Sequence, residues 1–276
     1  MIPVGSSKKA VRRIGLARAL SKLGYCSRSQ AEEWIRAGRV RLNERVRFDP
    51  ETPVHLTCDH ILVDDRPIEA GEKIYLMMNK PRGLITTAAD EKGRETVYSL
   101  LKTTGPVAGG VDSLRGVSTR VNPAWVAPVG RLDKASEGLL LLTNDSEWGA
   151  RVTAPETHLQ KTYHVQIATV ADKTLIAGLK TGVKAEEKSG DGETMRARGA
   201  RLLRSGQKNC WLEIILTEGK NRQIRHMLQA LRIDVLRLVR VAIGPLQLGN
   251  LAKGDYRPLT ADEKKMLDRA MQRRIS

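Results

Sequence analysis

A single aspartate in a glycine-bounded turn is the residue of this chain best placed to do chemistry. Residues 130–138 begin and end with glycine and present Arg131 and Asp133, and an apolar run, residues 139–142, follows directly. A carboxylate beside a rigid buried strand is held in place, as catalysis by positioning requires. Aspartate is also a common turn or capping residue, so the pattern alone leaves a purely structural role open.

The elements that position this turn can be predicted from hydrophobic periodicity. Residues 139–142 are expected to form a buried strand, and a helix should begin near Asn144 and end before Pro155. An alternating segment over residues 74–78 predicts another strand, and residues 235–243 predict a third. The aspartate turn is therefore expected to be anchored in a sheet.

Two later segments bring further basic residues. A helix starting near Asn221 is predicted by apolar residues at i, i+3, i+4 and i+7, which are Ile224, Met227, Leu228 and Leu231. Arg222 and Arg225 fall on another face of this helix, with Gln229. In the third predicted strand, Arg237 and Arg240 lie among apolar residues, which predicts a half-buried sheet with a basic exposed side.

The N-terminal part of the chain carries most of the positive charge. The formal net charge is +16, and residues 8–47 contain twelve Lys and Arg against three Asp and Glu, a net +9. An apolar stripe ending at Gly24 predicts one helix, Ser27 with Gln30 predicts the capped start of a second, and a hairpin is expected around Asn43. The arginines expected on the outer side are Arg28, Arg36, Arg39 and Arg41. This surface suits a phosphate backbone, although a basic helix pair that only faces solvent would show the same charge.

Motifs along the whole chain resemble one known family. In order, they are Asn79-Lys-Pro-Arg-Gly83, Gly130-Arg-Leu-Asp133, Lys161-Thr-Tyr163, Glu218-Gly-Lys-Asn-Arg-Gln-Ile-Arg225 and Lys253-Gly-Asp-Tyr-Arg-Pro-Leu259. They resemble the motifs of the S4-containing ribosomal pseudouridine synthases, and the N-terminal segment resembles the S4 RNA-binding domain. Ser136 and Ser146 depart from the usual family pattern, and neither change affects the carboxylate.

The resemblance implies roles for three side chains. Asp133 would be the catalytic carboxylate, Tyr163 the aromatic wall for an everted uracil, and Arg225 the cation that pairs with Asp133 and keeps it ionised. A carboxylate can attack the sugar or remove a sugar proton, and the sequence leaves both open. Without the resemblance, Tyr163 would equally fit an ordinary half-buried strand tyrosine.

The remaining basic residues of these motifs are expected to contact RNA. In the catalytic part, the expected contacts are Lys80, Arg82, Arg131 and Arg222. In the S4-like part they are the four outer arginines named above. An ordinary solvated arginine remains an alternative for Arg222.

No cofactor and no metal are expected. Converting uridine to pseudouridine neither adds nor removes atoms, and the sequence contains neither a Walker motif nor a metal-ligand cluster. Cys26, Cys58 and Cys210 are far apart and predict free thiols. No apolar run approaches the ~18 residues of a bilayer crossing, and no signal peptide is recognisable, so a cytoplasmic protein without a membrane partner is expected.

The expected fold class is α+β. A small S4-type RNA-binding domain, residues 12–70, would follow a flexible basic arm, residues 1–11. The catalytic domain, residues 73–276, would contain a mixed, mainly antiparallel sheet with flanking helices. Residues 103–128 are rich in Gly, Pro, Ser and Thr and predict a long surface loop, which leaves the choice of substrate open.

The expected function is site-specific isomerisation of uridine to pseudouridine in ribosomal RNA, with large-subunit RNA favoured. The expected partners are ribosomal RNA and ribosome-assembly intermediates, and a monomer is the default. The alternative is a catalytically silent RNA-binding or ribosome-assembly factor that kept the synthase fold. The intact set of Asp133, Tyr163 and Arg225 favours the enzyme. An unrelated hydrolase is disfavoured, since the sequence has no GxSxG, HExxH or paired-carboxylate motif.

Overall fold

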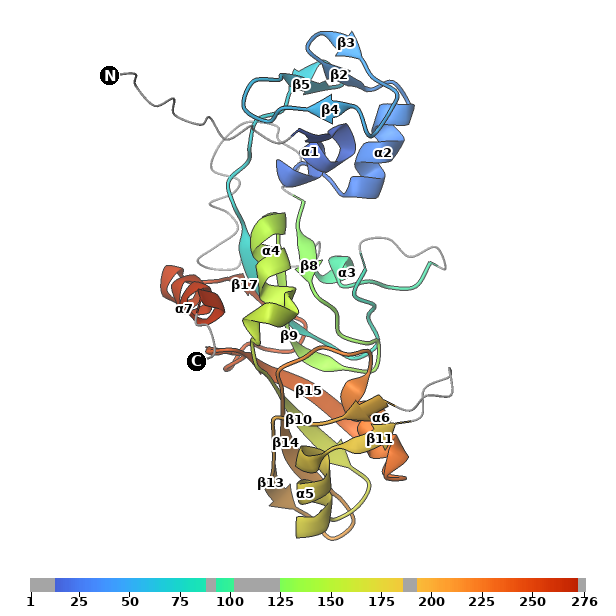
Figure 1. Ribbon diagram of the computed structural model, residues 1–276, viewed down its shortest axis with the longest axis vertical. Coiled ribbons are helices and arrows are strands. Elements are labelled where there is room, and N and C mark those ends of the chain that lie inside the picture. The colour runs from blue at the N-terminus through green and yellow to red at the C-terminus, as the bar shows by residue number, and fades with distance from the viewer. Residues whose placement is uncertain (1–12, 88–92, 102–124, 186–192, 273–276) are drawn as a thin grey trace, which may run out of the picture. The chain divides into compact units, whose positions relative to one another are not determined.

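The computed structural model describes residues 13–87, 93–101, 125–185 and 193–272 (Figure 1). These residues form two compact units. One unit contains the described residues up to Lys73 together with residues 125–127 and 144–146, and the other contains the remainder. The predicted arm, residues 1–11, and most of the predicted loop, residues 103–124, lie outside the described residues.

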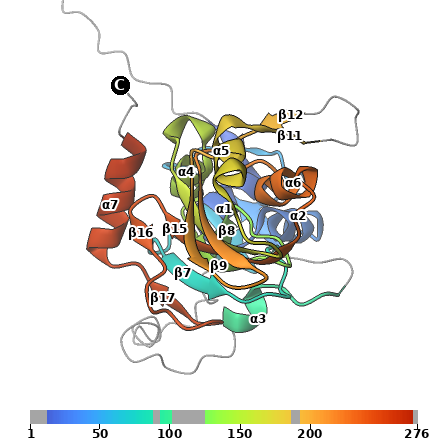
Figure 2. The ribbon, with the colours of Figure 1, turned by 90° about the horizontal axis from the view of Figure 1, so that it is seen from below.

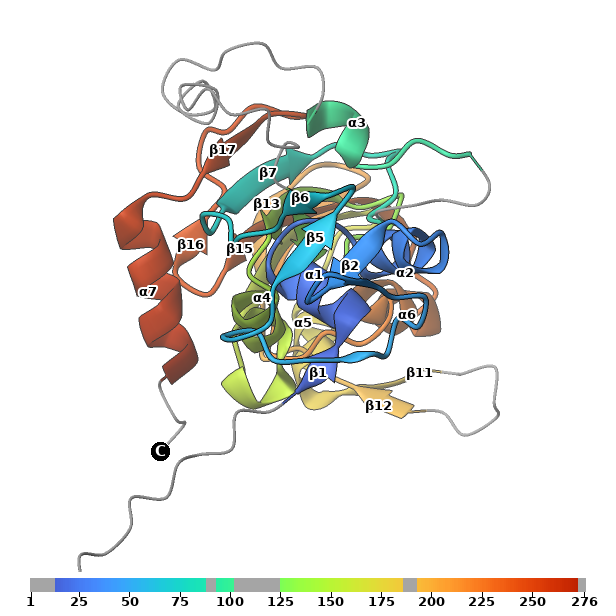
Figure 3. The same ribbon diagram turned by 90° about the horizontal axis from the view of Figure 1, so that it is seen from above.

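The N-terminal unit packs two helices against short strands. Its elements are β1 (Ile14–Gly15), α1 (Leu16–Lys22), α2 (Arg28–Arg36), β2 (Val40–Leu42), β3 (Arg45–Val46), β4 (Pro53–Val54), β5 (Ile61–Val63) and β6 (Arg66–Pro67). The strands form a sheet in the order β3-β2-β5-β6 and a separate β1-β4 pair, and Figure 3 shows β5 beside β2. Leu16, Leu20 and Ile35 are completely buried, so the predicted helical stripes face the core of this unit.

Local sequence signals fix the ends of these elements as predicted. The Ser27 hydroxyl accepts a hydrogen bond from the Gln30 amide at 3.1 Å and caps α2. Gly24, just beyond α1, has a φ of +76°. Asn43 and Glu44 both have positive φ, the conformation of a two-residue hairpin turn whose twist matches that of its strands. The prediction of two helices and a hairpin is confirmed.

The larger unit is built on one mixed sheet. Its strands are β7 (Tyr75–Lys80), β8 (Ala127–Val129), β9 (Glu137–Thr143), β10 (Lys161–Ile167), β11 (Val183–Ala185), β12 (Glu193–Met195), β13 (Gly199–Ser205), β14 (Cys210–Leu216), β15 (Val235–Ile243), β16 (Leu246–Gln247) and β17 (Tyr256–Pro258). The sheet follows the order β13-β14-β10-β15-β9-β7-β17, with β16 on β15 and β8 on β9, while β11 and β12 pair separately. The β9–β15 pair is parallel, and the pairs of β10 with β14 and β15 and of β7 with β9 are antiparallel. The α+β class with a mixed, mainly antiparallel sheet is confirmed.

Helices and two apolar cores flank this sheet. The helices are α3 (Tyr98–Leu101), α4 (Ser146–Thr153), a 3₁₀ turn (Pro155–Thr157), α5 (Lys173–Thr181), α6 (Gln223–Ala230) and α7 (Ala261–Gln272). Figure 2 shows α7 beside β16 and α6 beside β11. One core contains Ile167, Leu179 and Met227, and the other contains Met77 and Leu139. The four leucines of the run over residues 139–142 are completely buried, as predicted for a central strand.

The three cysteines are free, as predicted. Cys26 and Cys210 are buried and Cys58 is exposed. Burial raises the pKa of the Cys26 thiol to about 12, which makes it unreactive at neutral pH. Within the part of the chain that the structure describes, no group of His, Cys, Asp and Glu is arranged to hold a metal ion. None of the described helices combines the length and the apolar character needed to span a bilayer.

Candidate active site

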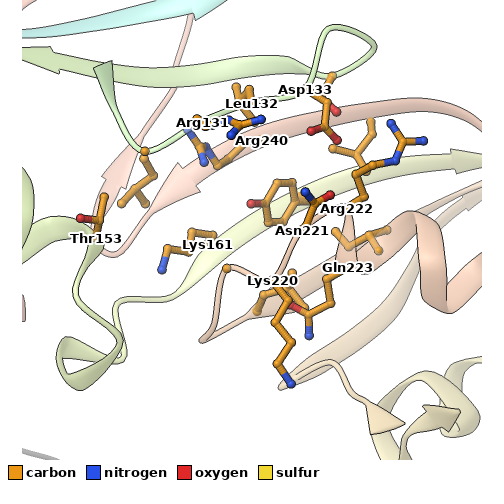
Figure 4. A pocket seen from close by; sticks show the side chains of 18 of the residues that line it. Arg131, Leu132, Asp133, Thr153, Lys161, Lys220, Asn221, Arg222, Gln223 and Arg240 are labelled. Carbon is orange, nitrogen blue, oxygen red and sulfur yellow. The ribbon is translucent and has the colours of Figure 1, made fainter. Parts of the chain in front are cut away.

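A pocket of about 380 Å³ opens on the larger unit beside the aspartate turn. Asp133, Tyr163 and Arg225 all line it, although they lie on a turn, a strand and a helix that are far apart in sequence. Figure 4 shows Asp133 and Thr153 at opposite ends of this pocket, with Lys161 and Arg240 between them in that view. The structure thus brings the three predicted catalytic residues into one cavity of a size typical for small ligands.

The carboxylate of Asp133 is free to react. Its side chain is half-buried, and among the described residues no group donates a hydrogen bond to it or pairs with it within 4 Å. The backbone around it is held more firmly. The Ser136 amide bonds the Asp133 carbonyl at 2.9 Å, and the Thr86 hydroxyl donates to the Leu132 carbonyl at 2.7 Å. The turn is therefore fixed through its backbone, and the carboxylate is left open toward the pocket.

Lys80, which the sequence predicted to contact RNA, is completely buried at the end of β7, so that prediction is wrong. Its Nζ donates hydrogen bonds to the carbonyl oxygens of Pro81, Asp133 and Ser136 at 3.0, 3.2 and 2.9 Å. Burial lowers the pKa of Lys80 to about 8, and the nearby Asp133 charge opposes this shift. Lys80 therefore ties the aspartate turn to the sheet.

Replacing Lys80 by Met is expected to lower kcat while leaving RNA affinity unchanged. Without the ammonium group three carbonyls lose their donor and the turn shifts, and a misplacement of about 1 Å costs roughly 10- to 100-fold in rate. The buried side chain makes no phosphate contact, so the salt dependence of RNA binding should stay the same. If the Kd for RNA and the slope of log Kd against log salt changed as much as kcat, Lys80 would contact RNA after all.

The same variant provides a test by pH. The pKa of Lys80 is about 8 in the folded chain against 10.5 for an ordinary lysine, so between these values the unfolded chain binds more protons at this position. Stability then rises with pH across this window. The free energy of unfolding of the wild type minus that of Lys80→Met, measured with denaturant, should increase from about pH 8 to pH 10.5. A difference that falls over this range would contradict the buried ammonium.

Arg225 binds the backbone of the turn instead of the carboxylate. Its Nη2 donates to the Ala135 carbonyl at 3.1 Å, and no ion pair joins it to Asp133 among the described residues, so the predicted pairing is wrong for this structure. Burial and then the Arg222 charge lower the pKa of Arg225, and Asp133 opposes the shift. Its Nε is buried without a hydrogen-bond partner.

Arg240, predicted to lie on an exposed basic side of its strand, is buried with 5% of its surface exposed, so this prediction is also wrong. Its Nε donates to the Leu139 carbonyl at 2.7 Å, and the residue lines the pocket. Strand alternation could have found it, because Leu238, Arg240 and Ala242 share the buried parity. Arg237, of the opposite parity, forms a bidentate pair with Glu137. The sequence reasoning also missed Lys161 as a pocket residue.

Sequence comparisons now decide the family. A profile described as RNA pseudouridylate synthase matches residues 74–230, which is more than half of the chain. A profile described as S4 domain matches residues 14–61. The chain belongs to the RNA pseudouridylate synthases. The resemblance inferred from the motifs is confirmed, and so is the expectation of an isomerase of this family.

Individual relatives align with this chain over almost its full length. A Bacillus subtilis (strain 168) protein named ribosomal large subunit pseudouridine synthase B is 34% identical over 255 residues, covering 91% of this chain and 94% of that protein. Another from the same strain, named uncharacterized RNA pseudouridine synthase YtzG, is 33% identical over 254 residues, covering 92% and 98%. A crystal structure of a pseudouridylate synthase aligns with a TM-score of 0.58 and 29% identity, over 92% of this chain and 99% of that one.

Three predicted RNA contacts of this pseudouridylate synthase are exposed around the site. Arg131 and Arg222 line the pocket, and Arg222 precedes α6 with a φ of +48°. Arg82 is exposed and does not line the pocket, but its charge acts on Arg225. A polyanion reaching the pocket would meet these guanidinium groups first.

Of the four predicted arginine contacts of the S4 domain, Arg41 is half-buried and the other three are exposed, and each one faces an acidic side chain. The pairs are Arg28 with Glu32 and Glu51, Arg36 with Glu32, Arg39 with Asp64, and Arg41 with Asp65. The sequence reasoning did not foresee these partners. Exposed ion pairs contribute little to stability, so a phosphate can replace the carboxylate at little cost.

Proposed function

We propose that this chain isomerises uridine to pseudouridine in ribosomal RNA, with Asp133 as the catalytic carboxylate. The observation that carries the proposal is the meeting of Asp133, Tyr163 and Arg225 in one pocket, together with membership of the RNA pseudouridylate synthases. Among the described residues the carboxylate is unpaired, it lies close to the buried Lys80 and the half-buried Arg225, and it is attached to a turn that the sheet holds in place. These conditions suit a group that must react in its ionised form.

The proposed chemistry needs an everted nucleotide. A uracil stacked against Tyr163 would recover part of the few kcal/mol that unstacking requires, and would present its sugar to Asp133. Asp133 then either attacks the sugar or removes a sugar proton, the glycosidic bond breaks, and the uracil turns and rejoins the sugar through carbon. Lys80 and Arg225 keep the turn in place through its carbonyl groups while the base moves.

The proposed substrate is large-subunit ribosomal RNA. The name of the 34% identical relative supports it, and the S4 profile match supports a second site of RNA contact. We propose an RNA-binding domain over residues 12–70 and a catalytic domain over residues 73–276, which agrees with the break between compact units at Lys73. Ribosome-assembly intermediates as partners, a cytoplasmic location and action as a monomer belong to the same proposal.

A catalytically silent RNA-binding factor with this fold is the alternative function. Such a factor would need the basic S4 surface, but it would not need an unpaired carboxylate on a turn that the cations Lys80 and Arg225 hold by its carbonyl groups. The free carboxylate of Asp133 therefore favours the enzyme.

The test is to map pseudouridines in ribosomal RNA from cells with and without this protein. Carbodiimide adducts on pseudouridine stop primer extension, so one stop in large-subunit RNA should vanish on deletion and return when the wild-type chain is supplied. Unchanged stops in both ribosomal RNAs would favour the silent factor. A stop lost from small-subunit RNA would correct the proposed substrate.

A further inference from the structure

Two cationic side chains share one face of the sheet with Tyr163. Lys161 and Tyr163 are two residues apart on β10 and so point to the same side. Arg240 on β15 is the direct register partner of Tyr163, so its side chain also lies on that side, next to the tyrosine. All three residues line the pocket, and Figure 4 shows Lys161 and Arg240 reaching into it from adjacent strands.

No acidic group balances these two cations. Neither Lys161 nor Arg240 has an ion pair among the described residues, and Asp133 is the only acidic side chain in the described lining of the pocket. Arg240 donates one hydrogen bond through Nε, and its Nη2 is buried without any partner. Burial and then the charge of Arg240 lower the pKa of Lys161, which shows that the two cations act on each other.

This arrangement is unfavourable unless an anion completes it. Two like charges in a half-buried pocket repel each other, and an unpaired buried donor costs roughly 1 to 3 kcal/mol. An anion between them would remove both penalties, and guanidinium and ammonium groups are the usual partners of phosphate oxygens. Any nucleotide whose base lies against Tyr163 carries a phosphodiester on each side of its sugar, so the substrate itself supplies this anion.

We propose that Lys161 and Arg240 form an anion subsite that binds a phosphodiester group flanking the everted uridine. The inference rests on the proposed function and adds two substrate-binding residues to it. Holding one phosphate fixes the sugar relative to Asp133, so binding energy from a group that does not react is used to orient the group that does. The S4 arginines, in contrast, belong to the other compact unit and do not line this pocket.

The first test uses inorganic phosphate and needs no enzymatic activity. In the full chain with ¹³C-dimethylated lysines, phosphate should shift the NMR signal of Lys161, which is identified by its loss in Lys161→Gln. The signal of Lys173, an exposed lysine on α5, is the matched reference and should shift much less. In Arg240→Gln the response of Lys161 should weaken. If Lys161 responds no more than Lys173, no anion subsite exists here.

The second test uses an rRNA fragment that contains the mapped uridine. Lys161→Gln should lower kcat/KM at least roughly fivefold and reduce the slope of log Kd against log salt by about 0.7, the value for one phosphate contact on a single strand. Lys161→Arg should restore most of the activity, and Lys173→Gln should match the wild type. With a neutral methylphosphonate at the contacted linkage, wild type and Lys161→Gln should become equal.

An equal loss for Lys161→Gln on neutral and charged linkages, at both flanking positions, would overturn the subsite and assign Lys161 to the base or to packing. If the wild type isomerises no RNA at all, the proposed function fails, and the phosphate titration still decides whether the anion subsite exists. The two failures are therefore distinguishable.

Discussion

Replacing Asp133 by Asn is expected to reduce pseudouridine formation by at least ~10³-fold while RNA affinity stays within about twofold. Asparagine has nearly the same shape as aspartate but cannot ionise, so it can neither attack the sugar nor remove a proton. The hydrogen bonds of Lys80 and Ser136 go to the backbone carbonyl at this position, so the turn should keep its structure. Isomerisation displaces the hydrogen on uracil C5, and tritium release from C5-labelled rRNA measures the rate.

Asp172→Asn is the matched control for this loss of charge. The Asp172 carboxylate caps α5 by accepting a hydrogen bond from the Leu175 amide at 2.7 Å, and asparagine caps helices about equally well. Asp172 lies outside the lining of the pocket, so its variant should keep the wild-type rate. Wild-type activity of Asp133→Asn would refute the assignment of the catalytic carboxylate. Equal losses of rate and affinity would indicate misfolding, which thermal unfolding would reveal.

The positions that sequence reasoning predicted correctly are those set by local patterns. The helix caps at Ser27, the positive φ of Asn43 in its hairpin, and the strand Val235–Ile243 all follow from a few neighbouring residues. The burial of residues 139–142 follows from an unbroken apolar run. The family resemblance added the identity of the chemistry, which no periodicity could supply.

The errors concern side chains whose surroundings come from distant strands. Lys80 follows the predicted strand over residues 74–78 and precedes a proline, a pattern typical of an exposed loop, but two of its three carbonyl partners lie in a turn more than fifty residues later. Arg225 was expected to meet a carboxylate, and it bonds the Ala135 carbonyl of the same turn. Leu231 fits the stripe of α6, yet it is 37% exposed because the helix ends at Ala230. Each outcome depends on tertiary packing that local spacing does not encode.

The four S4 arginines illustrate a different limit. Their positions on an outer basic surface follow from the sequence, but Asp64 and Asp65, the acidic partners of Arg39 and Arg41, lie in a turn between strands β5 and β6. Both of these aspartates have positive φ, as in a tight two-residue turn. The net charge of residues 8–47 suggested that most of these guanidinium groups are unpaired, whereas each of the four has an acidic partner.

Gly138 lies between two neighbouring strands close to the pocket, and Gly138→Ala is expected to destabilise the fold strongly. In β9 it pairs with Lys80 of β7 on one side and with Arg240 of β15 on the other. Its φ is +101°, and a Cβ added there would lie 2.2 Å from the Arg240 carbonyl oxygen. The atoms nearest to this Cβ all belong to the Arg240 backbone. They cannot move aside as a flexible side chain could, so alanine must force the parallel β9–β15 pair apart.

The expected loss for Gly138→Ala is roughly 3 to 5 kcal/mol in the free energy of unfolding, from backbone strain together with overpacking. Gly178→Ala is the matched control, because this glycine lies within helix α5 and a Cβ there meets nothing within 4 Å. That variant should gain about 0.5 to 1 kcal/mol, since alanine favours the helix. Denaturant unfolding measures both changes.

The displaced strand carries Arg240 and lies beside the Asp133 turn, so any folded Gly138→Ala protein should also lose activity at temperatures where it remains native. Wild-type stability and rate for Gly138→Ala would mean that β9 and β15 do not approach this closely, and the argued geometry of the pocket would then be wrong.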